Sequence, residues 1–540
     1  MAAMLNTPDN RRPGSVGLST LAALILLTSA FMGSAAAAVW RVIPEYERAL
    51  PGRPLPPQTE AHLFAARGEY QAFQIAVSSP PGLRLLDATC SDLSANPSRR
   101  IAAVNVTIYR EHYAHVDVAS PDWHGLNRSQ GAGWYPDALI PFRNPKTGKP
   151  PAGEYQAAPF RLGPSEILTV WVDVFVPRGT APGDYHALLT LASDQGNIDV
   201  PWTLTVWGFD LPLKPSLRSS FAYWNPVGRE AIEELLRHRL MPLRIPAPGT
   251  ASTERELKTS LGLGMTDTGF WSGADNSHCT MKPAPPVNSL LASAATHDAG
   301  LYLFNYTADE VQNCRNLYPT IQAWARNLHE AHIRNLVVIP PVPQLYDDGA
   351  GSGRSAVDIW VVLPMQYVHS SAELTAVRAR GNEVWSYNAA VQDAFSPKWL
   401  IDYDPIGYRL QAGFLSQSLG LTGLLYWRID RWDGDVWKNI NNQGVFSAGN
   451  YPGEGLLVYP GGPAGVPGVV PSLRLKQLRE GVQDYEYVEL LKHLGRGEWA
   501  LQQVRSIAKD WVEWTRSGDA VKALRQRLGA EIARLSASAP

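Results

Sequence analysis

Two neighbouring carboxylates, Asp309 and Glu310, are the residues whose types and spacing best suggest chemistry. They follow the apolar run 301–304 by a few positions, so we expect them just past the carboxyl end of a strand, the face that carries the active site in βα barrels. Two carboxylates there can divide the work of cleaving a glycosidic bond, because one protonates the leaving oxygen while the other stabilises positive charge. The structural alternative is that Asp309 caps a helix beginning at Glu310.

The adjacency of the pair favours one kind of glycoside cleavage. Common two-carboxylate mechanisms place the acid and the base or nucleophile on opposite sides of the scissile bond. Neighbouring side chains more readily serve a substrate-assisted route. In that route the acetamido oxygen of the sugar attacks, one carboxylate orients the amide, and the other protonates the leaving group.

Aromatic residues at the ends of two further strand candidates suggest a sugar subsite. Partly exposed rings can form its floor and walls, and nearby aspartates can accept hydrogen bonds from sugar hydroxyls. For any single ring, the alternative is packing between the barrel and its helices. The expected substrate-binding residues are Trp385, Tyr387, Tyr426, Trp427, Asp430 and Trp432.

The sequence gives no reason to expect a metal, a cofactor or a nucleic acid. His112 and His115 flank a strand candidate, but their spacing puts them on opposite faces. No phosphate-binding loop, dinucleotide fingerprint or Gly-x-Ser-x-Gly elbow occurs in a suitable context. The net charge of −2 excludes a protein that binds polyanions through bulk positive charge.

The elements that position these residues predict a multidomain α/β chain. Residues 39–212 contain period-two runs, such as 170–176 and 200–206, separated by turn residues, which indicate a β-sandwich. Short apolar runs alternate with helical segments over 213–470, and this order favours a (β/α)8 TIM-like barrel. Residues 471–540 are expected to form C-terminal helices packed on the barrel.

The first 38 residues have the pattern of a secretory signal peptide. Arg11 and Arg12 precede the apolar stretch 18–33, and small residues over 34–38 offer a cleavage site. A retained membrane anchor is the alternative. In an oxidising compartment Cys279 and Cys314 could pair, which would leave Cys90, the third cysteine, buried and free.

Several segments resemble the glycoside hydrolase family 123-like proteins of bacteria. The segments are 66–74, 423–427, 455–461, 471–475 and 478–487. The resemblance implies an N-terminal β-sandwich and a (β/α)8 catalytic barrel. It also implies a retaining β-N-acetylgalactosaminidase that acts through an adjacent Asp-Glu pair. Carried onto this chain, Asp309 would orient the acetamido group and Glu310 would be the acid/base.

The sequence therefore predicts an exported bacterial glycosidase, periplasmic or extracellular. Its substrate would be a glycan or glycoconjugate with β-linked N-acetylhexosamine. No membrane partner is expected beyond export, and the sequence does not predict an oligomeric state. Two alternatives remain. One is a glycosidase for non-acetamido sugars with a second carboxylate from Asp358, Glu383, Asp402 or Asp430. The other is a non-catalytic glycan-binding envelope protein.

Overall fold

The computed structural model describes residues 39–78, 82–163, 166–246, 250–442 and 449–537. The expected signal peptide, residues 1–38, lies outside them. Within these ranges, no helix combines the length and hydropathy needed to cross a bilayer.

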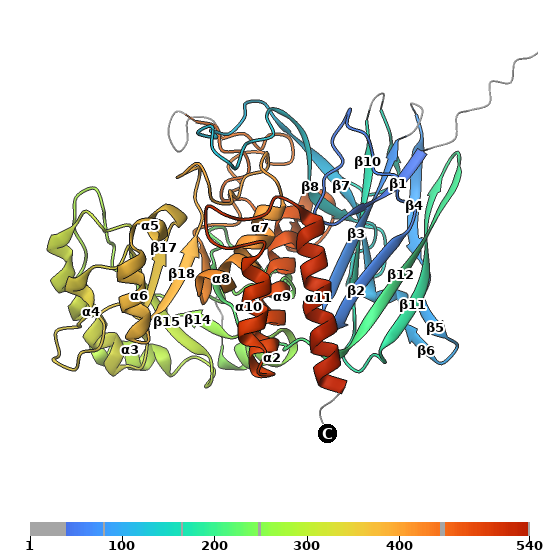
Figure 1. Cartoon of the computed structure of the whole chain (residues 1–540). Helices are drawn as coiled ribbons and strands as arrows, with labels where there is room; N and C mark the ends of the chain where they lie inside the picture. The colour runs from blue at the N-terminus through green and yellow to red at the C-terminus, as the bar shows by residue number, and fades with distance from the viewer. Residues whose placement is uncertain (1–38, 79–81, 164–165, 247–249, 443–448, 538–540) are drawn as a thin grey trace, which may run out of the picture. The chain divides into compact units, whose positions relative to one another are not determined.

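The N-terminal region folds into two sheets that share one core, as the period-two runs predicted (Figure 1). Val170, Val172 and Val174 of one sheet pack with Trp202 and Leu204 of the other. The first sheet has the order β1 (Val39–Pro44), β3 (Tyr70–Ser78), β10 (Leu168–Phe175), β7 (Val106–Val116), β8 (Gly133–Pro141). The second has the order β2 (Ala61–Arg67), β12 (Gly196–Asp210), β11 (Gly183–Ser193), β4 (Arg84–Cys90), β9 (Phe160–Arg161). Beside it, β5 (Leu93–Asn96) pairs with β11, and β6 (Arg99–Ile101) pairs with β5.

A parallel sheet of seven strands forms the core of the second region, where the alternating pattern predicted βα units. Its order is β13 (Arg218–Phe221), β19 (Gly423–Tyr426), β18 (Glu383–Tyr387), β17 (Ile359–Val362), β16 (Arg334–Val338), β15 (Tyr302–Asp309), β14 (Met265–Asp267).

A short extended segment, 241–243, bridges the two edge strands of this sheet. The Phe221 amide donates to Met241 O at 3.0 Å, and the Leu243 amide donates to Phe221 O at 2.9 Å. On the other side, the Asp267 amide donates to Leu243 O at 2.9 Å. The sheet is thus nearly closed into a barrel, and 241–243 occupies the place of the eighth strand.

Helices follow most of the parallel strands. They are α1 (Arg229–Arg237), α2 (Ala251–Leu261), α3 (Val287–Ala294), α4 (Tyr318–Glu330), α5 (Pro364–His369), α6 (Ser371–Ala379), α7 (Ile406–Leu410) and α8 (Ser416–Leu419). The β16–β17 connection departs from the expected alternation, because it contains only the 3-10 turn Pro343–Leu345. A two-stranded sheet, β20 (Val458–Pro460) and β21 (Val469–Pro471), precedes the C-terminal helices.

The C-terminal helices are α9 (Leu473–His493), α10 (Gly497–Arg505) and α11 (Gly518–Ala537). Ser472 caps α9, since its side chain accepts a hydrogen bond from the Leu475 amide. The expectation that these helices pack on the barrel is incomplete, because α9 also makes ion pairs with the sandwich. Residues 473–488 of α9 are all buried.

Buried ion pairs join α9 to the first sheet. Asp173 of β10 accepts hydrogen bonds from Arg479 at 2.6 and 2.8 Å and from Lys476 at 2.9 Å. Burial alone would raise the pKa of Asp173, but the two cations hold it well below its usual range. Arg474, one turn before, makes a two-bond pair with Asp137 of β8 at 2.8 and 2.9 Å. Each charge therefore depends on its partner for solvation.

The Cys279–Cys314 disulfide forms as expected, with Cα atoms 5.1 Å apart. It joins the loop after β14 to the segment that follows Glu310. Cys90 is free, as expected, but it is partly rather than fully buried. Burial raises the pKa of its thiol to about 11.

We expect Asp173→Ala to lower the free energy of unfolding by about 3–5 kcal/mol, because it leaves Arg479 and Lys476 buried without their carboxylate. Denaturant titration measures this loss. The control is Glu513→Ala, which breaks an exposed pair with Lys509 and should cost no more than about 1 kcal/mol. If both variants lost the same small free energy of unfolding, the buried ion pairs of Asp173 would contribute no more to stability than an exposed pair, which would contradict this prediction.

Replacing Cys279 and Cys314 together by serine should lower the free energy of unfolding by about 2–4 kcal/mol, since the bond closes a loop of 35 residues in sequence separation. The matched control Cys90→Ser should change it by no more than about 1 kcal/mol. If three thiols reacted in the native, unreduced protein, the Cys279–Cys314 disulfide would be absent, which would contradict the structure.

Candidate active site

Asp309 is the last residue of β15, and Glu310 follows it directly at the carboxyl-terminal mouth of the barrel. Both side chains are partly buried. No helix begins at Glu310, because the next helical turn starts at Arg315. Asp309 therefore does not cap a helix.

A bulge at Thr307 determines which way Asp309 points. Tyr306 pairs with Leu336 of β16, but the next pair is Ala308 with Val337, so one residue is inserted on β15. Tyr306 packs with the barrel interior, while Ala308 packs with the outer layer. The insertion shifts the alternation, and Asp309 comes to the inner side with Tyr306. The Tyr306 hydroxyl donates to Asp309 Oδ1 at 3.0 Å.

Glu310 is held by its backbone and by a second tyrosine. Its φ of 50° lies in the left-handed region, which costs a residue with a Cβ on the order of 1 kcal/mol or more. Its amide donates to Val338 O at 2.9 Å, and the Tyr387 hydroxyl donates to Oε1 at 2.6 Å. The two neighbouring carboxylates thus have separate tyrosine partners from β15 and β18.

The pair is electrostatically coupled. Burial and the Glu310 charge raise the pKa of Asp309 to about 6, and the Tyr306 hydrogen bond opposes this rise. Burial and the charge of Glu310 also raise the pKa of Tyr387 well above its usual value. The Tyr387 hydroxyl therefore stays protonated and can donate to Glu310 throughout the neutral range.

Three of the expected substrate-binding residues lie away from the mouth and pack in the fold. Trp385 is fully buried inside the barrel, and its Nε1 donates to Glu383 at 3.0 Å. Tyr426 is fully buried on the outer side of β19 and donates to Glu454 at 3.2 Å. Trp432 donates to Val458 O at 2.9 Å and packs against the sandwich core.

Asp430 is also structural in this arrangement. It is fully buried and accepts hydrogen bonds from the amides of Trp224 and Asn225 at 2.7–3.0 Å. It therefore fixes the segment after β13 and has no oxygen directed to a substrate. Of the six expected residues, Tyr387 and Trp427 remain at strand ends next to the mouth.

Three further residues at the mouth were not predicted: Tyr306, Trp271 and Trp224. Trp271 is 46% exposed and meets Tyr306 edge-to-face at 5.8 Å. Trp224 is 62% exposed and meets Trp427 edge-to-face at 5.2 Å. Two of them had a usable signal: Tyr306 closely follows the apolar run 301–304, and Trp224 lies shortly after β13 as Trp427 lies after β19.

The proposed second carboxylates lie elsewhere. Glu383 begins β18 and Asp358 precedes β17, so both are at the amino-terminal end of the barrel. Glu383 accepts hydrogen bonds from Tyr302 and Thr422. Asp402 accepts hydrogen bonds from serines 120 and 129 of the N-terminal region. Across the described part of the chain, no group of three or more His, Cys, Asp or Glu residues is placed to hold a metal.

Comparisons with known proteins give a match of one segment to a family model and a similar fold. Residues 348–491 match the model of the glycoside hydrolase 123 catalytic domain. This region contains β17 to β19 and most of α9, and Asp309 and Glu310 precede it. None of the curated proteins matches the chain.

The chain is similar to a solved family 123 glycoside hydrolase from Clostridium perfringens, studied for glycolipid glycan hydrolysis. The identity is 13%, the TM-score is 0.64, and the match covers 93% of this chain and 100% of the other. A putative alpha-galactosidase from Bacteroides fragilis matches at 12% identity, with a TM-score of 0.22 and coverages of 71% and 66%. A beta-glucuronidase from Parabacteroides merdae matches at 11% identity, with a TM-score of 0.28 and coverages of 77% and 49%. The last two TM-scores are too low to indicate a shared fold. Residues 348–491 are thus similar to the glycoside hydrolase 123 catalytic domain, and the chain has a fold similar to that of the C. perfringens enzyme.

Proposed function

We propose that the protein is an exported, retaining glycoside hydrolase that removes β-linked N-acetylhexosamine, specifically N-acetylgalactosamine, by substrate assistance. The observation that carries this proposal is the Asp309–Glu310 pair, whose neighbouring carboxylates have separate tyrosine donors at the barrel mouth. The similar C. perfringens enzyme, studied for glycolipid glycan hydrolysis, supports a glycoconjugate as the substrate.

In the first step, Glu310 acts as the general acid and transfers a proton to the glycosidic oxygen as the C1–O bond breaks. The acetamido carbonyl oxygen of the sugar attacks C1 from the opposite face and forms an oxazolinium ion. Ionised Asp309 accepts the hydrogen bond of the amide N–H, which orients the amide and stabilises its positive charge. The Tyr306 hydroxyl holds Asp309 in this position.

In the second step, water enters from the face that the leaving group vacated. Glu310, now ionised, takes a proton from this water as its oxygen attacks C1 and the oxazolinium ring opens. Two inversions at C1 leave the product in its original configuration. Tyr387 donates a hydrogen bond to Glu310 and so stabilises the ionised form that the first step creates.

The tryptophans at the mouth would bind the sugar and its aglycone. Trp271 touches Tyr306, and it is therefore the ring best placed beside the sugar that Asp309 orients. Trp224 and Trp427 would extend this aromatic surface. Export agrees with the Cys279–Cys314 disulfide, because such bonds persist in oxidising compartments.

The rival glycosidase mechanism, with a second carboxylate across the scissile bond, is less well supported. Its carboxyl groups would stand about 5–10 Å apart on opposite sides of the sugar. The candidates Asp358, Glu383, Asp402 and Asp430 are all engaged in other hydrogen bonds. A non-catalytic glycan-binding role has no specific observation in its favour.

Aryl glycosides of β-GalNAc, β-GlcNAc, β-galactose and β-glucose test the proposal directly. We expect turnover of the acetamido sugars alone, with β-GalNAc preferred. Asp309→Asn should lower kcat/KM on the order of a hundredfold or more for every acetamido substrate. Glu310→Gln should lose most activity where the leaving group needs a proton and least where the phenol is strongly acidic.

The matched control is Glu330→Gln at the exposed end of α4, which should keep full activity. Equal loss of activity by Glu310→Gln on all leaving groups would contradict its role as the acid. Retained activity in both site variants would remove the pair from the mechanism.

The pH dependence of kcat/KM should have an acid limb near pH 6, because Asp309 loses its ability to accept the amide N–H as it is protonated. Tyr306→Phe removes a hydrogen bond to the ionised form, so it should raise the pKa of Asp309 and move this limb to higher pH. Tyr302→Phe, at the opposite end of β15, is the control and should leave the limb in place. A limb that does not move in Tyr306→Phe would contradict the assignment to Asp309.

A further inference from the structure

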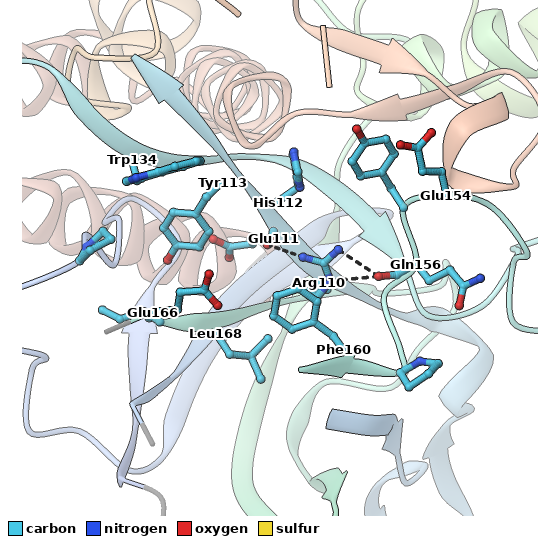
Figure 2. A pocket seen from close by; sticks show the side chains of 14 residues that line it. Arg110, Glu111, His112, Tyr113, Trp134, Glu154, Gln156, Phe160, Glu166 and Leu168 are labelled. Atoms are coloured by element: carbon cyan, nitrogen blue, oxygen red, sulfur yellow. Dashed lines mark hydrogen bonds between the residues drawn. The ribbon is translucent and has the colours of Figure 1, made fainter. Parts of the chain in front are cut away.

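A cavity of about 900 Å³ lies within the N-terminal region, apart from the barrel mouth (Figure 2). All its described lining residues fall between Pro51 and Leu168. The pairing of β7 with β10 ends at Arg110 and Val170, and the cavity lies where these two strands no longer pair with each other. Its volume is in the range of pockets that hold small ligands.

Aromatic side chains form much of the wall. Trp134 is 52% exposed, and Tyr155 and Phe160 are partly exposed. The Tyr155 ring is fixed by stacking on Trp437 at 4.6 Å with an interplanar angle of 15°. Rigid, partly exposed rings of this kind suit the flat C–H faces of sugar rings.

Glu111 brings an unusual polar group to this wall. Glu111 is 1% exposed, neither of its carboxyl oxygens makes a hydrogen bond of regular geometry, and Thr169 is close enough to favour its ionised form only in part. A buried polar group without a partner costs free energy that a ligand can recover. Burial raises the pKa of Glu111 to about 8, against opposing effects of Thr169 and Arg48. At neutral pH the carboxyl group can therefore both donate and accept a hydrogen bond, as a sugar hydroxyl requires.

The basic side chains of the wall are already engaged. Arg110 turns toward the main chain, and its Nε and Nη2 donate to Gln156 O at 3.1 and 2.9 Å (Figure 2). Burial lowers the pKa of His112 to about 4, and its Nε2 lies 3.0 Å from Trp437 O. Arg110 is the single arginine or lysine among the described lining residues, so nothing here favours an anionic ligand.

We propose that this cavity is a second glycan site, which binds a neutral oligosaccharide with Glu111 on a sugar hydroxyl and Trp134 against a sugar ring. The choice of a glycan over another neutral polar ligand rests in part on the proposed function. The binding itself requires no hydrolysis. The site would hold a length of glycan chain while the barrel acts on another part of the same material.

The test is equilibrium binding to the full chain carrying Glu310→Gln, by calorimetry and tryptophan fluorescence. The probes are N,N′,N″-triacetylchitotriose, cellotetraose and β-1,4-galactotetraose. We expect saturable binding of at least one probe, weakened about tenfold or more by Trp134→Ala. Glu111→Leu should weaken it similarly, and Glu111→Gln, which keeps a donor and an acceptor, should restore it.

Two controls separate this site from the barrel mouth and from general damage. Trp123→Ala removes an exposed tryptophan outside the cavity and should leave binding unchanged. Trp271→Ala, at the mouth, should leave the component that depends on Trp134 unchanged. In the chain with an intact catalytic pair, Trp134→Ala should hydrolyse a small aryl glycoside at the wild-type rate.

No saturable binding of any probe would overturn the inference, and so would binding that is the same in Trp134→Ala and Glu111→Leu as in the parent. Failure of the proposed function is a different result: no aryl glycoside is hydrolysed, whatever the cavity binds.

Discussion

The arrangement of this protein depends on one helix, α9, whose charged side chains are buried and paired on several sides. Arg479 and Arg474 of α9 form ion pairs with Asp173 and Asp137 of the sandwich, respectively. Asp484 of α9 pairs with Arg409 of α7 at 2.6 Å. An ion buried without its partner costs several kcal/mol, so each pair allows only a narrow range of positions for the elements it joins. The sandwich, the barrel and the C-terminal helices are therefore held together through α9 (Figure 1).

The candidate site uses local departures from regular structure on that rigid frame. The bulge at Thr307 turns Asp309 to the inner side of the barrel, and the left-handed conformation of Glu310 turns the next carboxylate away from the strand. Each carboxylate then meets its own tyrosine hydroxyl. Two adjacent residues on a regular strand would point to opposite faces, so these two departures allow neighbours to share one site.

The sequence predicted what depends on local pattern. Period-two runs identified sandwich strands, and the apolar run 301–304 located the strand that ends at Asp309. It could not distinguish the barrel's inner and outer faces, because parallel strands buried on both sides lack polar alternation. Tyr426 faces outward and Trp427 lies at the mouth, although they are neighbours. Trp385 and Tyr387 share a face but lie at different depths.

Other features that the sequence did not predict also depend on contacts between residues far apart in the chain. The segment 241–243 is too short to give a strand signal, and its role is visible only from its hydrogen bonds to both sheet edges. The charges of α9 would ordinarily mark a solvent face, but here Arg474, Lys476 and Arg479 find carboxylates hundreds of residues away. The bulge at Thr307 likewise follows from pairing with β16 and leaves no local mark.

The central claim is that the acetamido group of the substrate is the nucleophile and that Asp309 receives its N–H. The most direct test is inhibition by a thiazoline that mimics the oxazoline intermediate, compared in the parent enzyme and in Asp309→Asn. We expect competitive inhibition of the parent enzyme with an affinity well above that of the substrate, and a large loss of this affinity in Asp309→Asn. An enzyme that hydrolyses the aryl β-N-acetylhexosaminide but ignores the thiazoline would contradict the account.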